Sequence, residues 1–134
     1  MCGLGSSSVR KIPVDDAGRM DIGILELTIL TDKNNGYTPL FVNAGAGTTV
    51  LGSYDPFREI GEVCRRLGLW FHVDGSWGGS VVFSERLKGK MYGADRADSV
   101  TVNPHKMLNV PVTCSFLLAR DTRVFHRANT IEAG

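Results

Sequence analysis

The stretch DPFREIGEVCRRLGLWFHVD, residues 55–74, decides the fold that the sequence predicts. Its first part predicts a helix, because its apolar residues recur at helical spacing and form one stripe. The stripe consists of Phe57, Ile60, Val63, Cys64 and Leu67. Asp55 followed by Pro56 is expected to cap this helix, and the glycine after the stripe to end it. The apolar residues 69–74 then predict a strand that ends on the charge of Asp74.

An apolar strand is also expected at residues 40–44, and the glycine-rich residues 45–54 are expected to form the loop between this strand and the helix. Strand, helix and strand over this length form a βαβ unit. Its two strands run parallel, because the crossover helix returns the chain to the same end of the sheet. The fold class that follows is α/β, with a mostly parallel sheet and flanking helices.

The rest of the chain predicts further pieces of the same kind. A helix is expected to begin after Asp21, to run toward Leu30 and to stop at the Asn-Asn-Gly of residues 34–36. A weak helical segment is expected near residues 83–91. The remaining expected elements are strands at residues 99–103 and 113–119 and a terminal helix capped by Asp121.

The composition is that of one globular domain. The chain has 134 residues, of which 43% are hydrophobic and 22% charged. With a formal net charge of +1 and no basic stripe, the sequence indicates neither a nucleic-acid partner nor a charged membrane surface. No apolar run approaches the roughly 20 residues that span a bilayer. Residues 1–8 are rich in glycine and serine and are expected to form a flexible N-terminus.

The cysteines indicate a reducing compartment. Cys2, Cys64 and Cys114 are odd in number, and their spacing matches neither a disulfide framework nor a metal site. Free thiols and a cytoplasmic location are therefore expected.

A second informative stretch is SVTVNPHK, residues 99–106. Pro104 biases the residue before it toward extended geometry and ends the strand, so Lys106 falls just past the strand's carboxyl end. Asp74 ends another strand, and open α/β sheets hold their ligands at this edge. A partly desolvated lysine can form a Schiff base with an aldehyde, and a carboxylate can hold a protonated pyridine nitrogen.

Other interpretations remain open at this point. Lys106 also fits an ordinary surface lysine, and Asp74 an ordinary turn cap. Another interpretation is a metal site with His72, Asp74 and His105 as its ligands. This interpretation is less favoured, because a histidine that is hydrogen-bonded within the fold explains His72 equally well. The loop after residue 44 lacks the lysine of a phosphate-binding P-loop and the spacing of a dinucleotide fingerprint.

Three motifs together resemble a known family. They are Asn-Pro-His-Lys-Met at residues 103–107, His-Val-Asp at 72–74 followed by Trp-Gly-Gly at 77–79, and Gly-Thr-Thr at 47–49 with Asp-Pro downstream. They look like the group II pyridoxal-phosphate-dependent decarboxylases, in the branch of glutamate decarboxylase and cysteine sulfinate decarboxylase. The resemblance covers residues 9–134. It implies an incomplete large domain of the fold type I, aspartate aminotransferase-like, pyridoxal 5'-phosphate-dependent transferases.

The resemblance implies a role for each matching residue. Lys106 would form the Schiff base with pyridoxal 5'-phosphate, and Asp74 would bind the pyridinium nitrogen. Asn103 and His105 would lie near the cofactor phosphate, while Thr49 would lie close to Asp74 and the ring. No metal is expected.

Two positions carry further information. Ser76 stands where the family usually has an alanine that packs against the ring face, so a hydroxyl is expected there. Met107 stands where aromatic-amino-acid decarboxylases usually have tryptophan, which favours an acidic amino acid as substrate. Glutamate, cysteine sulfinate and aspartate remain open. An aminotransferase or another lyase of the same fold is disfavoured by the Asn-Pro-His-Lys-Met motif.

The resemblance also implies missing parts. Members of the family are several times longer, and their upstream phosphate-binding loop and C-terminal small domain have no counterpart in these residues. The chain is therefore expected to be part of a decarboxylase that is a homodimer at full length, and to be inactive by itself. The alternative is a truncated α/β scaffold without enzymatic activity.

Overall fold

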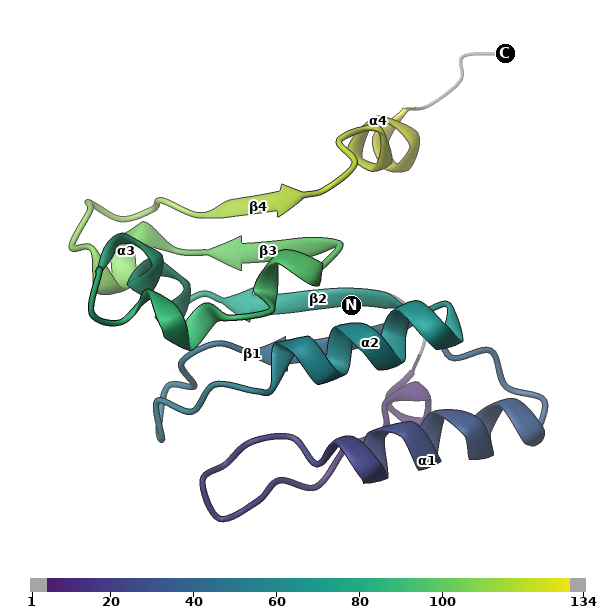
Figure 1. The fold of residues 1–134 in the computed structure, drawn as a ribbon. Coiled ribbons are helices and arrows are strands. Elements are labelled where there is room, and N and C mark those ends of the chain that lie inside the picture. The colour runs from purple at the N-terminus through teal and green to yellow at the C-terminus, as the bar shows by residue number, and fades with distance from the viewer. Residues whose placement is uncertain (1–4, 131–134) are drawn as a thin grey trace.

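The computed structural model describes residues 5–130, which form a four-stranded sheet with its longer helices in front of one face (Figure 1). The strands lie in the order β1 (Phe41–Gly45), β2 (Trp70–Gly75), β3 (Ser99–Val102) and β4 (Phe116–Ala119). The first three run parallel, and β4 is antiparallel to β3. The predicted mostly parallel sheet is therefore confirmed.

The βαβ unit forms as predicted. Helix α2 (Phe57–Leu67) buries the first four residues of the apolar stripe and leaves Leu67 partly buried. Beneath it, alternate residues of β1 and β2 complete the core, namely Val42, Ala44, Phe71 and Val73. Gly68 ends the helix in the left-handed conformation, with φ of 77°, and the chain enters β2 at once.

The predicted cap of α2 is wrong. The cap position is occupied by Pro56, and no side chain bonds the first turn. The carboxylate of Asp55 turns away instead. Its Oδ1 accepts the backbone N–H of Met20 at 2.7 Å, and its Oδ2 accepts that of Gly45 at 2.7 Å. Asp55 therefore joins two segments distant in sequence.

Helix α1 (Ile22–Asn34) begins as predicted and ends later than the expected Leu30. The Asp21 carboxylate accepts the N–H of Ile24 at 2.9 Å, which confirms the N-cap. Leu25 and Ile29 are buried in the core, and the helix stops at Asn35, within the predicted Asn-Asn-Gly.

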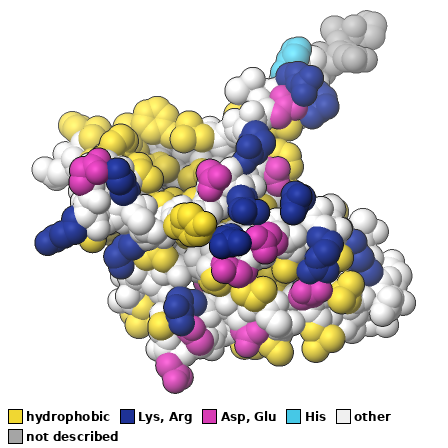
Figure 2. Space-filling view, viewed as in Figure 1, with side chains coloured by type: hydrophobic (Ala, Val, Ile, Leu, Met, Phe, Trp, Pro, Cys, Tyr) yellow, Lys and Arg dark blue, Asp and Glu magenta, His cyan; other side chains and the backbone are white. Residues whose placement is uncertain are grey.

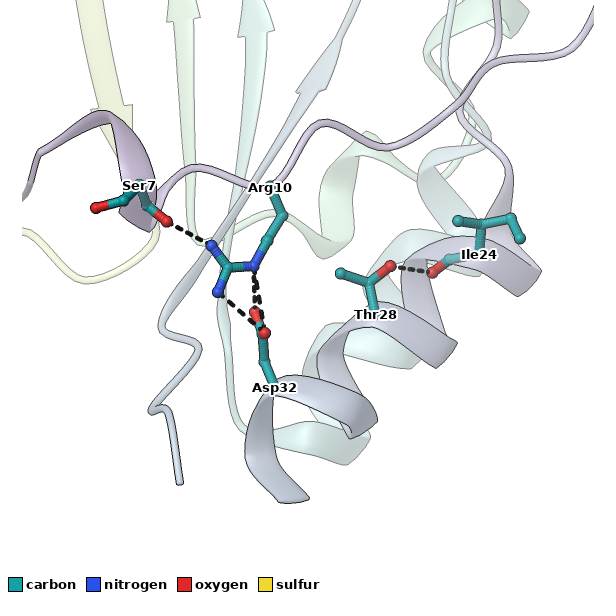
Figure 3. Close-up of polar contacts among 5 residues, drawn as sticks. All are labelled: Ser7, Arg10, Ile24, Thr28 and Asp32. Carbon is teal, nitrogen blue, oxygen red and sulfur yellow. Dashed lines mark hydrogen bonds and ion pairs between the residues drawn. The ribbon is translucent and has the colours of Figure 1, made fainter. Parts of the chain in front are cut away.

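The segment before α1 is fastened to it by Arg10. The guanidinium forms an ion pair with Asp32 of α1, with Nε 2.9 Å from Oδ2, and donates through Nη1 to the carbonyl of Ser7 at 2.5 Å (Figure 3). Ser7 belongs to the short 3-10 helix η1 (Ser6–Ser8). Residues 1–4 of the expected flexible N-terminus lie outside the described residues.

The single weak helix expected near residues 83–91 is wrong. The chain forms separate 3-10 turns there, which are η2 (Gly78–Phe83), η3 (Lys88–Met91) and then η4 (Ala94–Arg96). Gly89 inside this segment and the absence of an apolar stripe explain why no longer helix forms.

The remaining elements are shorter than predicted or were absent from the prediction. Strand β4 begins at Phe116 rather than at residue 113, and β3 ends one residue early at Val102. The expected turn after β3 is a one-turn helix, α3 (Pro104–Met107). The terminal helix α4 (Arg123–Asn129) forms as predicted, but the predicted Asp121 cap is wrong, because Thr122 occupies the cap position and makes no side-chain cap bond. The Asp121 carboxylate accepts the N–H of Arg123 at 3.0 Å.

The two faces of the sheet differ. The register places the side chains of Phe41, His72, Thr101 and Leu117 on the face opposite α2, and no described helix covers them. Phe41 and Leu117 are 53% and 55% exposed. Apolar side chains also gather near α3 and the start of β4 (Figure 2), where Val112 and Phe116 are exposed.

Candidate active site

The carboxyl edge of the sheet brings the predicted lysine and aspartate together. Gly75 of β2 pairs with Val102 of β3, so Asp74 and the residues that follow β3 lie at the same edge. Helix α3 then turns the chain back, and the N–H of Lys106 donates to the carbonyl of Asn103 at 2.9 Å. Lys106 is half-buried at this edge.

Trp77 positions the amine of Lys106. The Nζ atom lies 5.7 Å from the centroid of the Trp77 ring, within the range of a cation–π contact. Trp77 follows Asp74 by three residues, so its ring joins the lysine to the turn that carries the carboxylate. No role for Trp77 was predicted from the sequence. The sequence does contain a signal for such a role, which is an aromatic residue placed between Asp74 and the glycine pair 78–79.

Asp74 is held as an anion. Partial burial raises the pKa of its carboxyl, but hydrogen bonds from Ser76 and the nearby His72 and Lys106 outweigh this, so the pKa lies below its ordinary value. One of these bonds is from the Ser76 N–H to Asp74 Oδ1, at 3.0 Å. The site thus presents a charged carboxylate beside a lysine amine.

His72 lies next to Asp74 on the same face of β2 and is bonded on both sides. Its Nδ1 lies 2.7 Å from Ser99 Oγ, and its Nε2 lies 3.2 Å from Thr101 Oγ1. The Trp70 indole N–H donates to Ser99 Oγ at 2.9 Å, which leaves the serine proton free to go to His72 Nδ1. Burial lowers the pKa of His72, consistent with a neutral ring that carries its proton on Nε2.

These bonds also weigh against the metal interpretation of His72, Asp74 and His105. Both ring nitrogens of His72 already have protein partners, and His105 bonds elsewhere. Among residues 5–130, no group of three histidine, cysteine or acidic side chains is arranged to hold a metal ion.

The glycine-rich loop 45–54 is locked against the turn after Asp74. The Ala46 N–H donates to the Asp74 carbonyl at 2.8 Å, and the Gly78 N–H donates to the Ala46 carbonyl at 2.9 Å. Gly47 has φ of 73°, and a Cβ there would lie 2.6 Å from the Cα of Gly78. Only glycine permits this approach of the two backbones.

The same loop carries Thr49, which is exposed. Its expected position beside Asp74 and the ring stays a prediction. Tyr54 closes the other end of the loop, where its hydroxyl donates to the Gly78 carbonyl at 3.1 Å.

Asn103 and His105 flank the lysine. The Asn103 amide oxygen is buried without a hydrogen-bond partner among the described residues. His105 Nδ1 lies 2.6 Å from the carbonyl of Cys114 and 3.2 Å from its N–H; the shorter contact indicates that Nδ1 donates. Nε2 of His105 then remains the nitrogen available to a ligand.

These residues fit pyridoxal phosphate by their chemistry. Asp74 is an anion suited to a pyridinium nitrogen, and Lys106 supplies an amine for an aldehyde. The NH₂ group of the Asn103 side chain and, in the imidazolium form, the Nε2–H of His105 are the groups that could donate to phosphate oxygens.

Residues 1–134, the whole chain, match the pyridoxal-dependent decarboxylase conserved domain. The chain belongs to this family.

The chain is also similar in sequence to individual proteins of known name. The chain is 53% identical over 133 residues to an L-aspartate decarboxylase of Metarhizium robertsii, covering 99% of the chain and 26% of that protein. It is 46% identical over 132 residues to a glutamate decarboxylase-like protein of Gibberella zeae, covering 98% of the chain and 25% of that protein. The chain thus spans about a quarter of the length of these curated relatives.

A solved structure confirms the fold of this family member. The crystal structure of mouse CSAD superposes with a TM-score of 0.88 at 50% identity, over 90% of the chain and 26% of that protein. The predicted α/β fold, part of a type I large domain, is therefore confirmed. Among the described residues of the chain, no helix has the length and apolar character to cross a membrane.

Proposed function

We propose that this chain is the part of a pyridoxal 5'-phosphate-dependent decarboxylase that binds the cofactor's ring and aldehyde, in an enzyme that acts on an acidic amino acid. The observation that carries the proposal is the meeting of Lys106 and Asp74 at the carboxyl edge of the sheet, where their charges interact. Membership of the decarboxylase family supports it.

Each residue of the site has a distinct task in this proposal. Asp74 holds a proton on the ring nitrogen, and Lys106 attaches the cofactor through its amine. Asn103 and His105 hold the phosphate, Thr49 approaches the ring, and Ser76 lies against the ring face. When bound, pyridoxal phosphate supplies a ring that accepts the electron pair left as carbon dioxide departs.

The proposed substrate is aspartate, glutamate or cysteine sulfinate. Two relatives support this range, because one is named an L-aspartate decarboxylase and the other a glutamate decarboxylase-like protein. Met107, which stands where aromatic-amino-acid decarboxylases usually have tryptophan, also favours an acidic substrate.

We further propose a homodimer in the cytoplasm as the working form of the enzyme. The free thiols of Cys64 and Cys114 support a reducing compartment. The 134-residue segment alone is proposed to be inactive, because the parts that would complete the phosphate and substrate sites are not among its residues.

The test uses the intact gene product with added pyridoxal phosphate. We expect a visible absorption band from the cofactor bound to lysine, and carbon dioxide release from an acidic amino acid. Replacing Lys106 with alanine should abolish the band and reduce the rate of carbon dioxide release roughly 1,000-fold or more, because the covalent attachment of the cofactor is lost. Lys11→Ala is the matched control, because Lys11 is exposed and follows Arg10, which pairs with Asp32 near the last turn of α1.

The outcomes separate the candidates. A band that survives Lys106→Ala, or no band at all in the wild-type protein, would overturn the proposal and leave the non-catalytic α/β scaffold. A lysine-dependent band with no carbon dioxide released from the three acidic substrates would retain cofactor binding and refute the substrate class.

A further inference from the structure

We propose that the Tyr54 hydroxyl positions the amine of Lys106, and that it acts through the ring of Trp77. The inference rests on the proposed function above and deepens it, because it gives a residue of the loop 45–54 a part in attaching the cofactor to the lysine. Tyr54 is a positioning residue in this role, since it acts on the amine through other residues.

The first link is the backbone of Gly78, which is bonded on both sides to the loop 45–54. Its N–H donates to the Ala46 carbonyl at 2.9 Å, and its carbonyl accepts the Tyr54 hydroxyl at 3.1 Å. A Cβ on Gly78 would collide with that hydroxyl, so the approach is close. The position of Gly78 therefore depends on where Tyr54 holds it.

The Tyr54 side chain is itself held in place. The Nζ atom of Lys90 lies 5.0 Å from the centroid of its ring, within the range of a cation–π contact, and Tyr54 forms a backbone bridge with Ala46 across the loop. Burial raises the pKa of the phenol, so the hydroxyl keeps its proton and remains a donor at neutral pH. Removing the hydroxyl alone therefore leaves the ring and the loop in place.

The second link is the turn that carries Trp77. The residue before it, Ser76, donates its backbone N–H to Asp74 Oδ1 at 3.0 Å, and the residue after it is the doubly bonded Gly78. Trp77 lies between these two anchors with φ of −95° and ψ of −65°. Its side chain is 40% exposed, so packing alone does not fix the direction of the ring, and the anchored backbone does.

The third link is the contact between the Trp77 ring and Lys106, with Nζ 5.7 Å from the ring centroid. When a lysine attaches to an aldehyde, the amine nitrogen bonds to the aldehyde carbon, and the oxygen leaves as water with both amine protons. The nitrogen gains positive charge as the new bond forms, and the negative face of an aromatic ring attracts that charge. Trp77 favours this attachment while its ring faces the amine, which is the arrangement that Tyr54 maintains.

The experiment measures how fast the absorption band of the lysine-bound cofactor appears when pyridoxal phosphate is mixed with the cofactor-free intact gene product. We expect the rate to fall about threefold in Trp77→Leu, the effect of one cation–π contact at a partly exposed site, and about twofold to threefold in Tyr54→Phe. Tyr54→Phe should cause no further slowing in protein that already carries Trp77→Leu, because the two residues act in series. Trp77→Phe keeps an aromatic face and should recover most of the rate lost in W77L.

Tyr37→Phe is the matched control. Tyr37 is 60% exposed and precedes β1, on the side of the sheet where the parallel strands begin. The substitution removes the same hydroxyl, and the rate of band formation should stay at the wild-type value. Urea unfolding of Y54F separates a purely structural role, which would lower its stability without changing this rate and would overturn the inference.

A Tyr54→Phe or Trp77→Leu protein that forms the band at the wild-type rate also overturns it. So does a double variant in which the two slowing factors multiply, because Tyr54 would then act independently of Trp77. A wild-type protein without a lysine-dependent band refutes the proposed function instead, so the two failures are distinguishable.

Discussion

At the scale of single residues, Asp55 is bonded differently from the local pattern around it. An aspartate before Pro-Phe at the start of an apolar stripe is typical of a helix cap. Its two carboxylate oxygens instead accept the backbone N–H groups of Met20 and Gly45, each at 2.7 Å. The side chain therefore fixes the end of β1, from which the loop toward Asp74 departs.

We expect Asp55→Asn to lower the free energy of unfolding by about 1–3 kcal/mol, the cost of leaving a buried donor unsatisfied. The asparagine amide has one oxygen, so its NH₂ group must face one of the two backbone N–H groups. Urea unfolding of the intact gene product measures the change.

Asp16→Asn is the control, because Asp16 is exposed and takes part in no ion pair among the described residues. A helix cap tolerates asparagine as well as aspartate. An Asp55→Asn protein as stable as wild type would therefore contradict the role that we assign and restore the cap.

At the scale of the elements, β2 and β3 are joined by side chains as well as by their backbones. His72 of β2 bonds Ser99 and Thr101 of β3, and Trp70 bonds Ser99 again. These two strands carry Asp74 and lead to Lys106. The cross-strand bonds therefore set the spacing of the two groups that the site needs.

The lowered pKa of His72 makes stability depend on pH. The unfolded chain takes up the proton more readily than the folded chain, so stability is complete above the ordinary histidine pKa and is lost as pH falls below it. We expect the free energy of unfolding to decrease from about pH 7 to about pH 5. His72→Gln should flatten this part of the profile and cost about 1 kcal/mol at pH 8 through a lost hydrogen bond.

The profile is measured by urea unfolding across this pH range. His126→Gln is the control for removing one imidazole, because His126 lies in α4 outside the sheet, and it should keep the wild-type slope. Equal slopes for wild type and His72→Gln would show that His72 is not the group responsible.

Elements with a strong local pattern could be predicted from the sequence. The stripe of α2 and the strands beside it were predicted because their burial repeats at a regular period. The prediction of a single helix near residues 83–91 was wrong, because Gly89 and the mixed polarity of the segment leave no such period. At the site, Lys106 and Asp74 could be placed at one edge by strand direction alone. The bond from His105 to Cys114 could not be predicted from the sequence, because it depends on the path by which the chain brings Cys114, nine residues later, back to His105.

At the scale of the whole molecule, the two faces of the sheet are unequal. One face packs under α2, while the other exposes Phe41 and Leu117. Exposed apolar surface of this kind favours association with other surfaces.

We expect residues 1–134, expressed alone, to self-associate through this face. Leu117→Lys should weaken the association about tenfold, because a charge replaces a half-exposed leucine at the contact. Sedimentation at several protein concentrations measures it. Val50→Lys is the control, since Val50 is 91% exposed on the loop and gains the same charge. A monomer at every concentration, or an equal effect of both substitutions, would refute this.

The contact between Gly47 and Gly78 has a consequence for protein engineering. Because neither position admits a side chain, the backbones of the two loops behave as a single rigid unit rather than as separately exchangeable parts. A graft that transplants one loop into another scaffold without its partner would lose the geometry of both, so residues 45–54 and 75–79 should be moved as a pair.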